Sequence, residues 1–113
     1  MGTLHGRPVN RRRGEISAIL GGESHVLCLT LGALAELEDA FKVDSLADLV
    51  ERFASGRLRA ADLIRVVGAG LRGAGENLDD DAVAALTIDG GIEGLIALVA
   101  ELLAATFGTP PDP

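Results

Sequence analysis

Apolar and polar positions alternate with a period of two in the first part of the chain. Residues 15–20 (EISAIL) place Ile16, Ala18 and Leu20 on one face, as expected of a half-buried strand. Residues 25–31 (HVLCLTL) likewise place Leu27, Leu29 and Leu31 on one face. Gly21 and Gly22 open the segment between them, and glycine supplies the positive φ that tight hairpin turns need. The pattern predicts a β-hairpin from about Glu15 to Leu31.

Near Leu31 the period of the pattern changes from two to 3.6, which indicates amphipathic helices. A lone hairpin is marginal in water, so these helices must cover its apolar face. The predicted fold class is therefore α+β, with an N-terminal β-hairpin packed against four or five short helices. We expect them at about residues 32–41, 45–54, 60–71, 80–86 and 92–107.

The helical stripes also predict which side chains are buried. In the second helix they are expected to be Leu46, Leu49, Val50 and Phe53. The chain has three Phe and no Trp or Tyr, so its core must be mainly aliphatic. We predict a core that includes Leu37, Phe41, Leu49, Phe53, Ile64, Val67, Leu95, Val99 and Leu102.

A chain of 113 residues has room for one core and thus for one domain, which we place at residues 14–108. Residues 1–13 contain four arginines, no acid and little that is apolar, so we expect a flexible basic arm. The ending TPPDP at residues 109–113 cannot continue a helix, and we expect a disordered tail there.

Charge and composition exclude several classes of function. A net charge of −7 argues against a general nucleic-acid binder. The single cysteine, Cys28, excludes an internal disulfide and a cysteine-cluster zinc site, and fits a reducing compartment such as the cytoplasm. The most apolar stretch, residues 91–108, contains Glu93 and Glu101, so we expect a buried helix and no membrane span. No signal peptide is expected at the start of the chain.

Four short motifs have a structural explanation that we prefer to a chemical one. Gly68–Gly73 matches G-x-G-x-x-G, but the acidic, loop-like residues that follow do not begin the helix that a dinucleotide site needs. We expect these glycines where two helices approach closely.

Ser45 resembles the attachment serine of acyl carrier proteins, a distant alternative to a helix N-cap. His25 and Cys28 point to opposite strand faces, and Asp79–Asp81 is expected to cap a helix. No enzyme, metal site, cofactor or small-molecule substrate is expected.

Three stretches, in the same order, resemble the gene transfer agent family of small phage-tail proteins of alphaproteobacteria. They are RGEISAILGGESHVLCLTLGALAELEDAF (Arg13–Phe41), LVERFASGRLRAADLIRVVGAGLRGAG (Leu49–Gly75) and LVAELLAATFG (Leu98–Gly108). Members are encoded among the tail genes of domesticated phage-like particles. The resemblance implies a tail morphogenesis protein and supplies no catalytic residues.

Within that family we expect a tail assembly chaperone that acts with the tape measure protein. A tape measure protein is long, helical and apolar, and a small acidic protein with aliphatic helices suits helix-in-groove contacts with it. The alternative is a structural tail tube component that stays in the particle and contacts the tail tube protein. The expected partner-binding residues are Arg11, Arg12 and Arg13 in the arm and Leu95, Ile96, Val99 and Leu103 on the last helix.

The uneven charge also suggests contacts between copies of the chain. Residues 1–13 are basic, whereas residues 73–113 contain eight acids and no Lys or Arg. Contacts from basic end to acidic end would form rings or filaments. The first expectation is that the basic arm is only solvated, and the alternative is a homo-oligomer that weakens in high salt.

Overall fold

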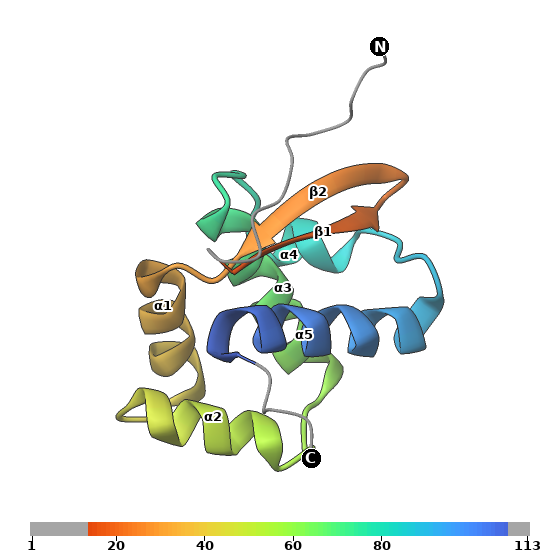
Figure 1. Ribbon diagram of the computed structural model, residues 1–113. Helices are drawn as coiled ribbons and strands as arrows, with labels where there is room; N and C mark the ends of the chain where they lie inside the picture. Colours follow the sequence, from red (N-terminus) through yellow and green to blue (C-terminus); the bar gives the residue numbers. More distant parts are fainter. Residues whose placement is uncertain (1–13, 109–113) are drawn as a thin grey trace.

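The computed structural model describes residues 14–108, which form a β-hairpin followed by five helices (Figure 1). The predicted α+β fold is confirmed. The hairpin lies over α3 and α5 at one end of the molecule, α2 lies at the opposite end, and α1 runs between the two ends. The elements are β1 (Glu15–Leu20), β2 (Glu23–Cys28), α1 (Leu31–Phe41), α2 (Leu46–Ala54), α3 (Ala60–Gly73), α4 (Asp80–Ala84) and α5 (Gly91–Phe107).

The hairpin has a two-residue turn. β1 and β2 pair antiparallel with Leu20 opposite Glu23, and the two residues between them, Gly21 and Gly22, have φ values of 61° and 83°. Positive φ at both positions is the turn geometry that suits the twist of paired strands, and glycine adopts it without strain. The alternating pattern and the glycine pair therefore specify the hairpin locally.

The second strand ends at Cys28, three residues earlier than we predicted. Thr30 is the N-cap of α1, because its hydroxyl accepts a hydrogen bond of 3.1 Å from the amide of Ala33. Leu31 is consequently the first residue of α1 and is 83% exposed. Its predicted place on the buried face of the second strand is wrong.

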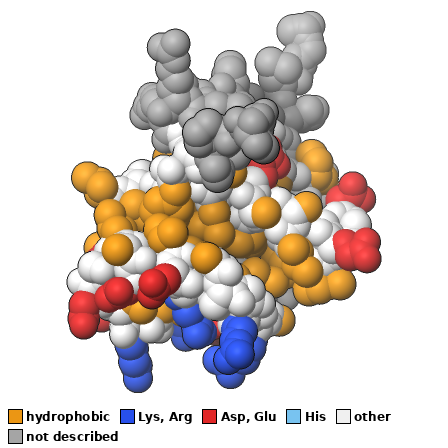
Figure 2. Space-filling view, turned by 60° about the horizontal axis from the view of Figure 1, so that its bottom comes forward, with side chains coloured by type: hydrophobic (Ala, Val, Ile, Leu, Met, Phe, Trp, Pro, Cys, Tyr) orange, Lys and Arg blue, Asp and Glu red, His pale blue; other side chains and the backbone are white. Residues whose placement is uncertain are grey.

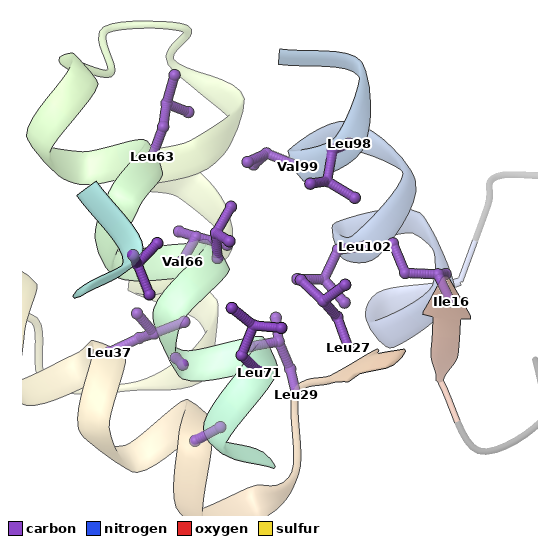
Figure 3. Close-up of a cluster of buried hydrophobic side chains, with 14 of the residues drawn as sticks. Ile16, Leu27, Leu29, Leu37, Leu63, Val66, Leu71, Leu98, Val99 and Leu102 are labelled. Atoms are coloured by element: carbon purple, nitrogen blue, oxygen red, sulfur yellow. The ribbon is translucent and has the colours of Figure 1, made fainter. Parts of the chain in front are cut away.

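The core is built around α3, which contacts β2, α1, α4 and α5. Figure 3 shows aliphatic side chains of α3, α5 and β2 meeting between α3 and α5, with Leu37 of α1 on the other side of α3. Of the nine predicted core residues, five are buried: Leu37, Leu49, Val67, Val99 and Leu102. The other four are partly buried and pack against the same cluster: Phe41, Phe53, Ile64 and Leu95.

Arg72 links three helices by charge. Its guanidinium on α3 forms an ion pair with Glu36 on α1 and another, at 3.1 Å, with Asp80 on α4. It also donates a hydrogen bond of 2.8 Å to the carbonyl oxygen of Leu78. Burial acts to lower the pKa of Arg72, but the hydrogen bonds that it donates to Glu36 and Asp80, together with the negative charges of these two side chains, outweigh burial and raise that pKa above its ordinary value. This side chain therefore stays charged and holds α1, α3 and α4 together.

Asp62 is the buried acid that fixes the start of α3. Its carboxylate accepts a hydrogen bond of 3.0 Å from the amide of Arg59, the N-cap residue of that helix. It also forms an ion pair of 3.3 Å with Arg52 on α2, whose guanidinium lies 5.5 Å from the ring centre of Phe41. The end of α2 and the start of α3 are thus held at a fixed separation, which defines the loop between them.

Candidate apolar docking site

An open apolar groove with a volume of about 370 Å³ lies between α5 and the segment that joins α2 to α3. Figure 2 shows the face of the molecule on which hydrophobic side chains gather around this groove. Residues 56–60 form much of one wall and α5 forms the other. The lining residues are Phe53, Gly56, Leu58, Ala60, Leu63, Ile92, Ile96, Val99, Ala100 and Leu103.

The wall on α5 follows from an excess of apolar positions in that helix. Leu98 and Leu102 are buried in the core. Ile92, Ile96 and Val99 are spaced by four and three residues, which is the spacing of one continuous stripe on a helix. Val99 is buried at the floor of the groove, whereas Ile92 and Ile96 are exposed at its edge. One side of α5 therefore fills the core, and a second side faces the groove.

The apolar surface continues on α2. Phe53 lines the groove, and Leu46 and Val50 lie on the same side of α2 because residues three, four and seven apart share a helix face. Leu46 and Val50 are exposed, so their predicted burial is wrong. Among the described residues, seven large apolar side chains are exposed, and five lie on α2 or α5: Leu46, Val50, Ile92, Ile96 and Phe107. Such a concentration is typical of a protein-binding surface.

The two edges of the groove carry opposite charges. Arg57 and Arg59 alternate with the lining residues of the α2–α3 segment, and both are exposed. Glu93 is exposed on α5, on the far side of the apolar stripe. Within residues 14–108 none of these three side chains forms an ion pair. A partner that enters the groove therefore meets a basic edge on one side and an acidic edge on the other.

Three of the four partner-binding residues predicted on the last helix lie together in this groove, namely Ile96, Val99 and Leu103. The fourth, Leu95, packs against the core and does not line the groove. Arg11, Arg12 and Arg13 lie outside the residues that the structure describes. The groove is also lined by residues that the sequence pattern did not mark for partner binding, namely Phe53, Leu58, Leu63 and Ile92. The spacing of apolar residues on α5 could have indicated Ile92. The opposite wall could not be predicted in this way, because it comes together with α5 only when the chain folds.

The four short motifs have structural roles in the described part of the chain. The glycines from Gly68 to Gly73 lie inside α3, and a Cβ at Gly73 would collide with the carbonyl oxygen of Cys28. The prediction that they mark a close approach is correct, although at Gly73 the neighbour is β2. Ser45 is the N-cap of α2, and its hydroxyl accepts a hydrogen bond of 3.1 Å from the amide of Asp48. Asp79 caps α4 in the same way.

His25 has a charged partner that the sequence did not reveal. Its Nδ1 lies 2.6 Å from the carboxylate of Glu76, in the loop after α3, so this contact ties the hairpin to that loop. In residues 14–108 no group of three or more His, Cys, Asp or Glu side chains is placed to hold a metal ion. None of the helices in that range is long and apolar enough to span a membrane.

Fold and groove together define a small α+β protein with an open apolar surface on one face. Residues 13–109 match the model of the family described as "Phage tail tube protein, GTA-gp10", so the chain belongs to this family of gene transfer agent tail proteins. The resemblance noted in the sequence is confirmed at that level. The family's description names the tail tube and not a chaperone. No curated protein matches the chain, and no solved structure does.

Proposed function

We propose that this protein is a structural component of the tail tube region of a gene transfer agent and stays in the finished particle. The observation that carries the proposal is the family match, which spans every helix and strand from β1 to α5. The role needs no catalytic step. The sequence favoured a tail assembly chaperone and gave the structural tail tube component as the alternative. The family's description favours the structural component, so we place it first.

The open groove supports a role in assembly. Structural proteins of a tail act by contacting other subunits, and an exposed apolar surface edged by charged residues is typical of such a contact. Here the apolar surface is the groove between α5 and the α2–α3 segment. Asp62 holds that segment in place through its hydrogen bond from the amide of Arg59. A net charge of −7 keeps the free protein soluble until the surface is covered.

A tail assembly chaperone that acts with the tape measure protein is the second candidate function. The spacing of Ile92, Ile96, Val99 and Leu103 favours it, because a stripe of this kind on a groove wall suits an amphipathic helix. A tape measure protein supplies long apolar helices. The two functions differ in where the protein ends up. A chaperone leaves before the particle is complete, whereas a tube component remains in it.

Quantitative mass spectrometry of purified particles, beside a lysate of the producing cells, distinguishes these functions. The proposal predicts that the ratio of this protein to the particle's other tail proteins is at least as high in particles as in the lysate. An abundant cytoplasmic enzyme serves as the control for carry-over. Depletion of the protein from particles to the level of that enzyme would contradict the structural role and support the chaperone.

A further inference from the structure

We propose that the basic arm, residues 1–13, folds back at Gly14 and binds an acidic hollow between β1 and α5 of its own chain. The arm and the acids of the hollow then neutralise each other in the free protein. Any partner that binds one of them must first displace the other. This binding is independent of the proposed function.

The hollow has a volume of about 230 Å³ and lies between β1 and one side of α5. Residues 17–20 line it on β1, and Gly94, Ala97, Leu98 and Glu101 line it on α5. These four positions of α5 share one side of the helix, because residues three and four apart are neighbours on a helix surface. None of them lines the apolar groove, so the two sites are separate.

The lining of the hollow is acidic. Asp89 and Glu101 are the charged residues that line it, and both are exposed. Within residues 14–108, Asp89 forms no ion pair with another side chain. No Lys or Arg occurs in residues 73–108, and none lines the hollow from β1. The two acids therefore favour a basic occupant.

The arm joins the described part of the chain beside this hollow. Gly14 is buried against the end of α5, since a Cβ placed on it would lie 3.4 Å from the carbonyl oxygen of Ala105. Ala105 is one turn beyond Glu101 on the helix surface. The φ of Gly14 is 78°, a conformation that glycine adopts in tight turns and that suits a reversal of the chain.

The length and charge of the arm fit the hollow. Residues 1–13 contain four arginines and no acid. An extended chain advances about 3.3 Å per residue, so Arg7 can lie up to about 23 Å from Gly14. Along α5, Glu101 is about 6 Å from the contact with Gly14, and the start of the helix, next to Asp89, is about 21 Å from it. The arginines therefore span the distance between the two acids.

Two further terms favour this occupant over the arm of a second copy. The last turn of α5 contains no basic residue, so arginines held beside it by Gly14 also meet the partial negative charge of the helix C-terminus. A short tethered segment has an effective concentration on the order of millimolar at its own site. The arm of another copy, at micromolar protein concentration, competes poorly with it.

Disulfide trapping in the full-length chain tests where the arm binds. Val9 and Ile19 are each five residues from Gly14, so a reversal at Gly14 brings them side by side. Ile19 is 51% exposed and lines the hollow, whereas Ile96 is 53% exposed and lines the groove. All variants carry Cys28→Ser. Val9→Cys should form an intramolecular disulfide with Ile19→Cys at least about tenfold faster than with Ile96→Cys.

Neutralisation of the acids tests the role of charge. Asp89→Asn with Glu101→Gln should slow formation of the disulfide in the hollow by about three- to tenfold, because each exposed ion pair contributes little. Asp39→Asn with Glu51→Gln is the matched control. It removes the same charges from exposed acids of α1 and α2 that do not line the hollow, and should leave the rate unchanged. Salt at about 1 M should slow the disulfide as neutralisation does.

The proposal is overturned if the disulfide with Ile19→Cys forms no faster than the disulfide with Ile96→Cys. It is also overturned if the disulfide joins two chains at micromolar concentration, because the hollow then binds the arm of a second copy. An effect of Asp89→Asn with Glu101→Gln no larger than that of its control contradicts it as well. A fast disulfide within one chain that depends on the two acids supports it, whatever the abundance of the protein in particles.

Discussion

The side chain of Leu102 on α5 occupies the space in which a side chain at Gly70 on α3 would lie. A Cβ placed on Gly70 would be 2.9 Å from Cδ2 of Leu102, closer than such contacts normally come. Leu102 is fully buried at this crossing. The close approach of α3 and α5 fixes which side of α5 faces the core, and thereby which side is left facing the groove.

Truncation of Leu102 to alanine should lower the free energy of unfolding by about 2–5 kcal/mol, because it leaves a cavity at the crossing of α3 and α5. Chemical denaturation measures this change. The control is Leu31→Ala, which removes the same atoms from a side chain that is 83% exposed and should change stability by less than about 0.5 kcal/mol. Equal effects of the two substitutions would contradict the packing described for α5.

Gly73→Ala should destabilise the protein by about 1–3 kcal/mol, because its Cβ would collide with the carbonyl oxygen of Cys28 and push β2 away from α3. Gly32→Ala on α1 is the control. Apart from its chain neighbours and the backbone of its own helix, its Cβ would come no closer than 3.9 Å to another heavy atom, Thr30 Oγ1. Alanine is also the better helix former, so stability should stay equal or rise slightly. Thermal unfolding should therefore give a lower Tm for Gly73→Ala and an equal or slightly higher Tm for Gly32→Ala.

Arg72→Gln should lower the free energy of unfolding by about 1–2 kcal/mol, because it removes the cation that Glu36 and Asp80 share and leaves the two acids facing each other. Arg65→Gln is the matched control on the same helix. Arg65 makes a longer contact of 3.9 Å with Asp80 and is half exposed, so its loss should change stability by less than about 0.5 kcal/mol. Urea denaturation that gives no larger loss for Arg72→Gln than for Arg65→Gln would contradict the bridging role.

The local features of the fold could be predicted from the sequence because each depends on a few neighbouring residues. The hairpin follows from alternation and a glycine pair, and the start of α2 follows from the cap formed by Ser45. The prediction failed where two local signals compete. At Thr30 the alternating pattern continues the strand, but a capping hydroxyl begins a helix, and the cap determines the structure.

Long-range contacts and exposed apolar positions could not be predicted in this way. A helical stripe shows that Leu46 and Val50 share a face, but only the folded chain shows that no described element covers that face. The contact between His25 and Glu76 joins residues 51 positions apart, and no local pattern marks it. For the same reason the stripe on α5 located half of the groove, whereas Leu58 on the opposite wall was missed.

The most direct test of this account asks whether the groove is the surface through which the protein acts in the tail. Producing cells would carry the chromosomal gene with Ile96→Glu or with the control Ile19→Glu, and the titre of gene-transferring particles would be measured with the cellular level of each variant. The account predicts wild-type titre for Ile19→Glu and a loss of at least about tenfold for Ile96→Glu at an equal protein level. Wild-type titre from cells that contain only the Ile96→Glu protein would contradict it.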